Sequence, residues 1–93
     1  MCGIAGDLRF DGSDANPDVL QTMARIMAPR GPDGSGMVVR GAAGFAHRRL
    51  KIIDLSDAGQ QPMEDAELGL TLAFNGCIYN HKELRAGLED RGY

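Results

Sequence analysis

The sequence predicts an α+β domain in which two helices pack on a mainly antiparallel sheet. Along the chain the residue patterns run strand, helix, several short strands and a second helix, which is typical of α+β domains. The 93 residues are enough for one modest hydrophobic core. Thirteen glycines, about twice the usual share, gather around residues 31–36, 41–44 and 76. These clusters indicate tight turns and close backbone approaches.

The first strand and the first helix are marked by the spacing of their residues. Residues 3–10 alternate as a half-buried strand does, and one face carries Ile4, Gly6, Leu8 and Phe10. Asn16 is a typical helix N-cap, and Pro17 suits the first helical position. Four residues at helical spacing then form one apolar face, namely Leu20, Met23, Ala24 and Met27. The helix is expected to end by Ala28, because Pro29 disfavours helical geometry in the preceding residue.

The middle of the chain predicts turns and short strands. Residues 30–36 are rich in glycine and proline and are expected to form a loop. Strands are expected at residues 37–40 and 43–47, joined by Gly41-Ala42. Residues 56–67 are polar and are expected to be turns rather than regular structure.

The last part of the chain predicts a strand followed by a helix. Residues 68–74 have strong strand character, and Asn75-Gly76 is the typical signal of a two-residue hairpin turn. Asn80 is expected to cap the last helix, with Glu83 completing a pair that resembles a capping box. Gly92 is expected to close that helix.

Composition and charge argue against several functional classes. The net charge of −3, the isoelectric point near 5.2 and only five aromatic residues do not suit a nucleic-acid surface. No apolar run approaches the ~20 residues that span a bilayer, and no signal peptide is evident. We therefore expect a cytoplasmic protein with reduced cysteines and no membrane partner. His47 and His81 lack partners at ligand spacing, so no metal site is expected.

Cys2 is the first candidate for chemistry. If Met1 is removed, Cys2 carries a nucleophilic sulfur and a free α-amine on the same residue. An α-amine ordinarily titrates at about pH 7.7–8.0, so it can serve as the base that activates its own thiol. The alternative is a small buried hydrophobe at the start of a strand, since free cysteines are often buried. Position alone does not distinguish the two.

Two further positions have both a structural and a chemical interpretation. Asn75-Gly76 alone is best explained as a hairpin turn, but an asparagine amide and a glycine N–H also make a good oxyanion hole. Arg49 lies in a basic cluster with Arg48 and Lys51, which suits a solvated surface. One arginine in a glycine-lined cleft can instead hold a substrate carboxylate through two parallel hydrogen bonds.

Taken together, five motifs identify a family resemblance. They are Met-Cys-Gly-Ile-Ala-Gly at 1–6, Pro-Arg-Gly-Pro-Asp-Gly-Ser-Gly at 29–36, His-Arg-Arg-Leu-Lys-Ile-Ile-Asp-Leu at 47–55, Gln-Gln-Pro-Met at 60–63 and Phe-Asn-Gly-Cys-Ile-Tyr-Asn at 74–80. In this order they resemble the glutaminase domain of class II (N-terminal nucleophile) glutamine amidotransferases, in the asparagine synthetase branch. The third and fifth motifs are most similar to N-acetylglutaminylglutamine amidotransferases, which amidate a dipeptide.

The resemblance implies a role for each candidate residue. The sulfur of Cys2 attacks the side-chain amide of L-glutamine, and water hydrolyses the resulting γ-glutamyl thioester after ammonia has left. The Asn75 side chain and the Gly76 N–H stabilise the oxyanion. Arg49 holds the substrate α-carboxylate, and the backbone near Ile52 helps to line the pocket. The loop at residues 30–36 shapes the cover of the site.

The resemblance also implies a fold and partners beyond this chain. Family members have an α-β-β-α Ntn-hydrolase sandwich, of which residues 1–93 would be the N-terminal part, truncated on its C-terminal side. No cofactor is implied for this segment. A C-terminal synthetase domain, absent here, would bind ATP and Mg²⁺ and receive the ammonia through an internal tunnel, and the full-length form can be a homo-oligomer.

One residue departs from the family pattern. Cys77 stands where asparagine synthetases usually carry glutamate, so it would line the substrate site without a carboxylate. Its expected proximity to Cys2 also raises the prospect of oxidative pairing.

Three hypotheses follow for the function. The chain is a glutamine-hydrolysing domain that feeds ammonia to an amide-forming synthetase, or a truncated fragment that needs a second chain or the missing part of the domain. The third is a small binding module that uses the basic residues 48–51 for anionic ligands. Motif order favours the first, length favours the second, and net acidity argues against the third.

Overall fold

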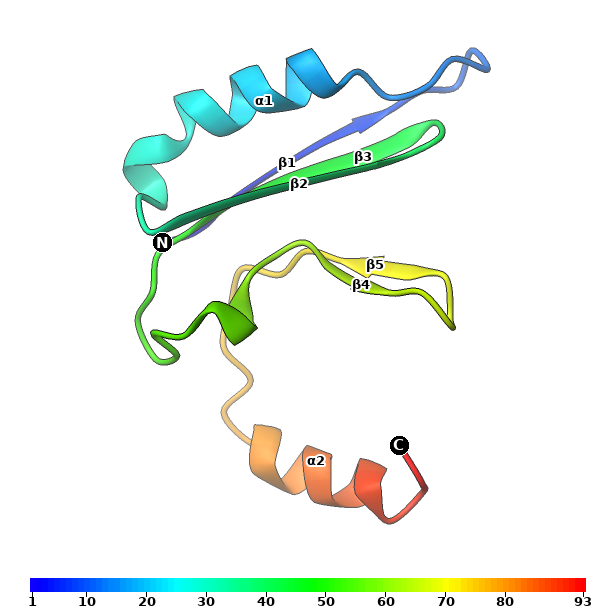
Figure 1. The fold of residues 1–93 in the computed structure, drawn as a ribbon. Coiled ribbons are helices and arrows are strands. Elements are labelled where there is room, and N and C mark those ends of the chain that lie inside the picture. Colours follow the sequence, from blue (N-terminus) through cyan, green and yellow to red (C-terminus); the bar gives the residue numbers. More distant parts are fainter.

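The computed structural model describes all of residues 1–93, and its elements confirm the α+β prediction (Figure 1). The strands are β1 (Gly3–Leu8), β2 (Gly34–Arg40), β3 (Ala43–Arg49), β4 (Met63–Asp65) and β5 (Leu70–Leu72). The helices are α1 (Pro17–Ile26) and α2 (His81–Glu89), with 3₁₀ turns at Ala28–Arg30 and Asp57–Gly59. Neither helix has the length and apolar character that a bilayer crossing requires.

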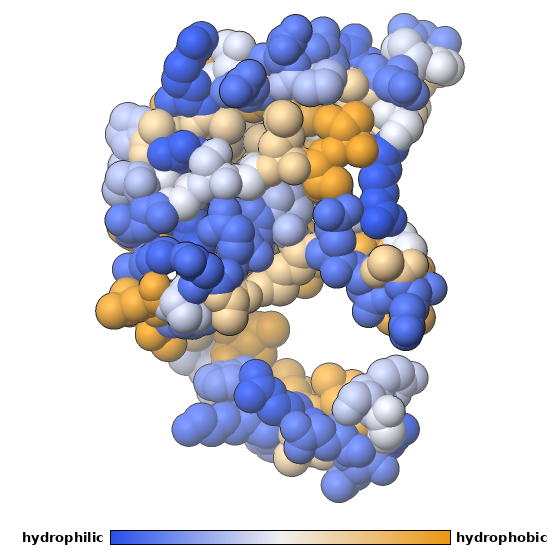
Figure 2. Space-filling model, in the orientation of Figure 1, coloured by the Kyte–Doolittle hydropathy of each residue, from blue (hydrophilic) through white to orange (hydrophobic).

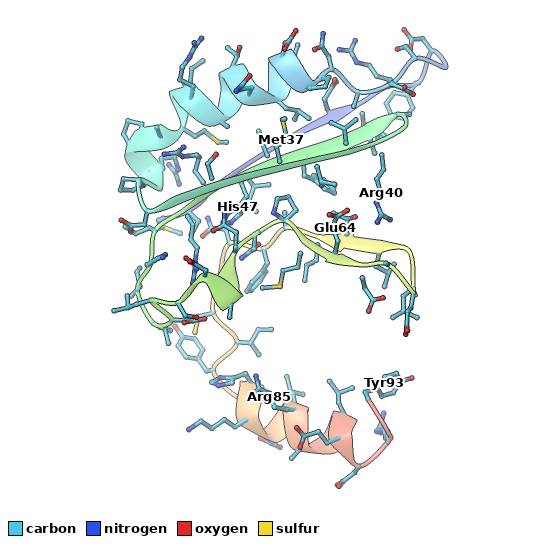
Figure 3. The ribbon with its side chains drawn as sticks, viewed as in Figure 1. Met37, Arg40, His47, Glu64, Arg85 and Tyr93 are labelled. Carbon is cyan, nitrogen blue, oxygen red and sulfur yellow. The ribbon has the colours of Figure 1, made fainter.

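The elements are arranged in four successive layers. Figure 1 shows α1, a sheet of β1, β2 and β3, the pair β4–β5, and finally α2. The first sheet has the order β1-β3-β2, and all strand pairs in both sheets are antiparallel. Arg40 of β2 and Glu64 of β4 form an exposed ion pair of 3.3 Å between the two sheets (Figure 3).

The packed core lies between α1 and the first sheet. As predicted, α1 begins at Pro17, and the side chain of Asn16 accepts hydrogen bonds from the backbone N–H groups of the first turn. Leu20 and Ala24 are buried against Ala46 of β3, whereas Met23 of the predicted face is 37% exposed. The helix lies close to the sheet because β3 offers small residues beneath it. A Cβ at Gly44 would approach the Leu20 side chain to 2.5 Å.

The strand β1 turns its small residues, not its large ones, toward α1. Ala5 packs against the core, and a Cβ at Gly3 would touch Met27 at 3.0 Å. Ile4 and Leu8, on the predicted apolar face, are 40% and 58% exposed. Phe10, which we expected on the same face, lies beyond the end of the strand.

The hairpin of β2 and β3 is longer than predicted. Gly41, with φ of +55°, turns the chain as expected. However, β2 begins at Gly34, inside the segment that we expected to be loop, and β3 continues to Arg49. Glycines weaken the strand signal in the sequence, but here Gly34 pairs with Arg49 and Gly36 with His47. Gly36 lets the backbone of Gln61 lie on the strand, and Gly34 leaves room for the Gln60 side chain.

The second sheet shows where local sequence signals were insufficient. The strand β4 lies in the segment that we expected to be turns, and it forms by pairing Met63 with Leu72 and Asp65 with Leu70. The strand β5 is limited to Leu70–Leu72, shorter than the predicted 68–74. This pairing depends on the partner strand beyond the turn at residues 66–69, which the polar residues of β4 do not reveal by themselves.

Two predicted local features after β5 are wrong. Asn75-Gly76 does not form a hairpin turn, because no strand follows it. Asn80 does precede α2, but its side chain makes no capping hydrogen bond. The first turn of α2 is held instead by backbone hydrogen bonds, including the His81 N–H to the Ile78 carbonyl at 3.2 Å.

The outer layers leave apolar side chains exposed. No residue of α2 is buried, and Leu84 and Leu88 are each 49% exposed. On the facing strand β5, Leu70 and Leu72 are 60% and 57% exposed. Figure 2 shows apolar surface on the side of α2 that is turned toward the two-stranded sheet. The buried apolar cluster of this structure is therefore confined to α1 and the first sheet.

His47 of β3 is a fully buried titratable residue between the first sheet and the loop that follows β5 (Figure 3). Neither ring nitrogen has a hydrogen-bond partner. Burial lowers the pKa of the imidazole from its ordinary 6.5; the nearby Phe74 backbone opposes this shift, and the Arg49 guanidinium adds to it. The fold therefore favours the neutral ring.

This burial predicts an acid-dependent loss of stability. As the pH falls from above 6.5, the unfolded chain takes up a proton at His47 that the folded chain resists, so the free energy of unfolding falls until the lower folded pKa is passed. His47→Leu should remove this part of the dependence when urea unfolding is compared at pH 7.5 and 5.5. The exposed His81 provides the control variant His81→Gln, which should retain it. An unchanged pH dependence in His47→Leu would contradict the interpretation.

Leu20 is predicted to carry a large share of the stability of the core. Its side chain is fully buried, so Leu20→Ala should lower the free energy of unfolding by about 2–5 kcal/mol through lost burial and a residual cavity. Gln21→Ala, on the exposed side of α1, should change it by less than about 0.5 kcal/mol. Urea unfolding measures both, and a loss below about 1 kcal/mol for Leu20→Ala would show that the core lies elsewhere.

Candidate functional site

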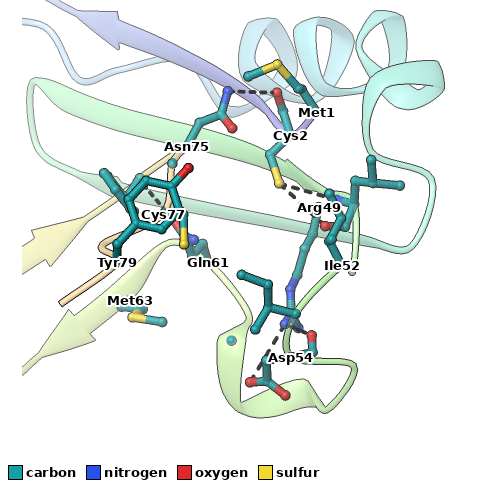
Figure 4. Close-up of a pocket in the computed structure, with 15 residues that line it drawn as sticks. Met1, Cys2, Arg49, Ile52, Asp54, Gln61, Met63, Asn75, Cys77 and Tyr79 are labelled. Carbon is teal, nitrogen blue, oxygen red and sulfur yellow. Dashed lines mark hydrogen bonds and ion pairs between the residues drawn. The ribbon is translucent and has the colours of Figure 1, made fainter. Parts of the chain in front are cut away.

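A cavity of about 500 Å³ lies where the N-terminus, the end of β3 and the loop after β5 meet (Figure 4). All six residues that the sequence singled out for catalysis or substrate binding line it. They are Cys2, Arg49, Ile52, Asn75, Gly76 and Cys77. Residues from opposite ends of the chain therefore share one site.

Cys2 is positioned by the pairing of β1 with β3. Gly3 pairs with Arg48, so Cys2 lies just beyond that pair, beside Leu50. The Leu50 N–H donates to the Cys2 sulfur at 3.3 Å, and the sulfur lies 3.8 Å from the Leu50 carbonyl oxygen. Cys2 is half-buried and lines the cavity rather than the core. Met1 also lines the cavity and is 71% exposed.

Asn75 and Gly76 lie beside Cys2 in an irregular loop. The Asn75 side-chain N–H donates to the Cys2 carbonyl at 3.2 Å (Figure 4). A carboxamide has two N–H donors, so one remains for a ligand. Gly76 packs on the ring of Phe74, where a Cβ would come within 2.7 Å of the ring. Only glycine fits at this position without displacing the ring.

Arg49 is a buried cation at the end of β3, only 6% exposed. Its two terminal nitrogens donate at 2.6 Å to the backbone carbonyls of Ser56 and Asp54, and one of them lies 3.9 Å from the Asp54 carboxylate. A Cβ at Gly59 would collide with the guanidinium. The loop at 54–59 thus wraps the guanidinium, which has five N–H donors and uses two on these carbonyls.

The aspartates of this loop remain ionised. Hydrogen bonds from the Ser56 hydroxyl and backbone N–H lower the pKa of Asp54 below its ordinary 3.8, with a smaller contribution from Arg49. The pKa of Asp57 is lowered mainly by a hydrogen bond from Lys51, whose ammonium lies 3.0 Å from the carboxylate. Both carboxylates therefore act as fixed negative charges beside the basic residues.

The basic cluster at residues 48–51 is occupied by internal partners. Lys51 pairs with Asp57, Arg49 is enclosed by the loop at 54–59, and Arg48 donates to the Gly31 carbonyl at 2.9 Å. This arrangement does not support the binding module for anionic ligands that the cluster alone suggested.

The remaining predicted residues occupy different places. Ile52 is 70% exposed at the edge of the cavity. Cys77 is exposed, and both cysteines are free thiols. Residues 30–36 do not line the cavity. They support the end of β3 instead, since the Asp33 carboxylate accepts the Lys51 N–H and the Asp33 N–H donates to the Arg49 carbonyl, both at 2.9 Å.

Sequence reasoning missed two residues that shape the site. The Gln61 side-chain oxygen accepts the backbone N–H of Phe74 at 2.5 Å, directly before Asn75. Gln61 lies in the Gln-Gln-Pro-Met motif at 60–63, and this motif was the sequence feature that could have indicated its role. Phe74, whose ring lies under Gly76, is the first residue of the motif at 74–80, and that motif was likewise its sequence signal.

The site combines the parts needed for acyl transfer. A thiol at the cavity edge, amide donors beside it and a guanidinium in the same wall can together attack, stabilise and orient an amide substrate that bears a carboxylate. No group of three or more histidine, cysteine or carboxylate side chains is placed to hold a metal ion.

Comparison with known proteins agrees with this chemistry. Residues 1–93 match the family of the glutamine amidotransferase domain. Among similar proteins, asparagine synthetase B [glutamine-hydrolyzing] of Escherichia coli (strain K12) is 42% identical over 98% of this chain and 16% of its own length. The glutamine-hydrolysing asparagine synthetase of Brassica oleracea is 40% identical over 100% and 16%, and asparagine synthetase 2 of Bacillus subtilis (strain 168) is 38% identical over 97% and 12%.

The chain thus spans about a sixth or less of the length of these relatives. No solved structure gives a significant match. Because the domain family covers every residue and the identities are close to 40%, the chain belongs to the class II glutamine amidotransferases of the asparagine synthetase family.

Proposed function

We propose that this chain is the N-terminal part of a domain that hydrolyses L-glutamine and supplies ammonia to an ATP-dependent, amide-forming synthetase. The observation that carries the proposal is the hydrogen bond of 3.2 Å between the Asn75 amide and the Cys2 carbonyl. It joins the candidate nucleophile to the candidate oxyanion donor across 73 positions of sequence. Arg49 in the same cavity supplies the cation that an amino-acid substrate needs.

The first half of the reaction uses Cys2 as nucleophile. After removal of Met1, the freed α-amine accepts the thiol proton while the sulfur forms a bond to the amide carbon of glutamine. The oxygen of the tetrahedral intermediate accepts hydrogen bonds from the free Asn75 N–H and from the Gly76 N–H. Each such donor contributes about 3 kcal/mol to transition-state stabilisation. The carbon–nitrogen bond then breaks, and the α-amine returns its proton to the departing ammonia.

The second half regenerates the enzyme. Water attacks the γ-glutamyl thioester with the α-amine as base, the carbon–sulfur bond breaks, and glutamate and the free thiol result. Ammonia leaves as a separate product that a second active site can use. Hydrolysis therefore needs no metal or organic cofactor within residues 1–93.

Arg49 is proposed to orient the substrate through its α-carboxylate. The carbonyls of Ser56 and Asp54 hold the guanidinium in place before the substrate arrives, so little side-chain entropy is lost on binding. Ile52 lines the cavity at its rim, and Cys77 lines it in place of the glutamate usual in asparagine synthetases. The substrate amine would then need a carboxylate from another part of the domain.

The proposal also covers the branch of the family, the fold and the synthetase domain. The residues of the motifs at 47–55 and 74–80 support membership of the N-acetylglutaminylglutamine amidotransferase branch. The four layers α1, first sheet, second sheet and α2 support an Ntn-hydrolase sandwich. We propose a cytoplasmic protein whose synthetase domain binds ATP and Mg²⁺, with homo-oligomers of the full-length form.

The alternative, that residues 1–93 have no independent activity, is favoured by one observation. Apolar side chains of α2 and β5 are half exposed or more. Burial of this surface contributes substantially to the stability of domains, so the segment would need further chain or a partner to hold the loop at 73–80. The active-domain hypothesis and the inactive-segment hypothesis assign the same chemistry to the site.

The Cys2 assignment is tested in the full-length protein. Cys2→Ser should abolish release of glutamate from glutamine, because the alcohol is a far weaker nucleophile than the thiol in this setting. Ammonia-dependent synthesis should be unchanged and serves as the internal control. Mass spectrometry of the wild type should find Cys2 at the N-terminus. Retained Met1 in an active enzyme, or glutaminase activity in Cys2→Ser, would refute the assignment.

The Arg49 assignment predicts a specific effect on substrate binding. Arg49→Ala should raise the KM for glutamine by about 100-fold, since a desolvated, bidentate carboxylate contact contributes about 3 kcal/mol. Lys51→Ala is the matched control, because Lys51 forms only a loop ion pair with Asp57 and should change KM less than about threefold. Ammonia-dependent synthesis should survive both changes. Equal loss of the two activities in Arg49→Ala would contradict the role.

A further inference from the structure

The loop that carries Asn75 and Gly76 is held in place by very few hydrogen bonds. The strand β5 ends at Leu72, and residues 73–77 make no hydrogen bond with any other backbone group. Only two hydrogen bonds fix this segment. One joins the Gln61 side-chain oxygen to the Phe74 N–H at 2.5 Å, and the other joins the Asn75 amide to the Cys2 carbonyl at 3.2 Å.

Gln61 is itself fixed to the first sheet. Its carbonyl lies so close to β2 that a Cβ at Gly36 would collide with it. The neighbouring Gln60 donates its side-chain N–H to the Ser35 carbonyl at 2.8 Å. Two contacts to adjacent residues of one strand therefore anchor the segment from which the Gln61 side chain extends.

These contacts form a continuous path from the sheet to the site. It runs from β2 through the Gln61 side chain to the Phe74 N–H, and the Phe74 ring then lies beneath Gly76. The Asn75 amide follows directly and reaches Cys2. Gln61 also lines the cavity (Figure 4).

We propose that Gln61 is the positioning residue of the oxyanion hole. Its carboxamide oxygen sets the position of the Phe74 peptide, and through it the directions of the Asn75 side chain and the Gly76 N–H. The inference rests on the proposed glutamine hydrolysis and adds to it a residue that acts through the Phe74 peptide. A displacement of about 1 Å in such donors can cost on the order of 100-fold in rate.

The function of Gln61 requires an acceptor and not a donor. The Gln61 side-chain nitrogen makes no hydrogen bond, whereas its oxygen accepts from Phe74. Gln61→Glu keeps an acceptor oxygen at the same distance along the side chain. Gln61→Met keeps the length and much of the volume but removes the acceptor. The two variants therefore separate the hydrogen bond from the packing of the side chain.

The test measures glutamine hydrolysis in the full-length enzyme. Gln61→Met should lower kcat about 10- to 100-fold while KM for glutamine changes less than threefold, because Arg49 still binds the carboxylate. Gln61→Glu should retain kcat within about threefold of the wild type. Gln21→Ala, which replaces an exposed glutamine of α1, is the control and should retain both parameters. Ammonia-dependent synthesis should be unchanged in all three.

A second measurement keeps the proposal testable if Gln61→Met is poorly folded. Amide hydrogen exchange at residues 73–77 should be faster in a Gln61→Thr variant, whose shorter side chain cannot reach the Phe74 N–H, and unchanged in Gln61→Glu. A wild type that releases no glutamate would overturn the proposed function itself. An active wild type with unchanged kcat in Gln61→Met, a rise in KM alone, or equal exchange in Gln61→Thr would overturn only the role of Gln61.

Discussion

The antiparallel pairing of β1 with β3 is the constraint on which the site depends. It brings the start of the chain to the end of β3, so that Cys2 exchanges hydrogen bonds with Leu50 and lies beside Arg49. The same pairing places small residues of both strands under α1, which buries Leu20 and fixes the sheet. The packed half of the fold thus positions the proposed nucleophile, and its stability is directly relevant to the proposed chemistry.

Close backbone approaches attach the rest of the site to this sheet. Gly36 admits the Gln61 carbonyl, Gly59 admits the Arg49 guanidinium, and Gly76 admits the Phe74 ring. Each of these contacts would be blocked by a Cβ, so the high glycine content has a specific structural use. The glycines supply proximity, while hydrogen bonds from Arg49 and to Gln61 supply direction.

The features that the sequence predicted well are local ones or belong to a strong motif. The Asn16 cap, the start of α1 and the turn at Gly41 depend on neighbouring residues and were predicted correctly. The six cavity residues were found because their motifs resemble a family. The strand β4 was missed because its partner lies beyond a turn. The hairpin turn predicted at Asn75-Gly76 was wrong because that dipeptide reports only a local preference. In the structure the loop is held by hydrogen bonds to Gln61 and Cys2, which are distant in sequence.

One half of the site is part of the packed sheet and the other half is held by few hydrogen bonds, and this difference bears on the proposed catalysis. Cys2 and Arg49 belong to the packed sheet, while Asn75 and Gly76 lie on a loop with two hydrogen bonds and beside layers with exposed apolar side chains. Segments with few buried contacts open more readily than the core. Formation of the proposed oxyanion hole is therefore the step most sensitive to the packing of α2 and β5, and placement of the proposed nucleophile is the least sensitive.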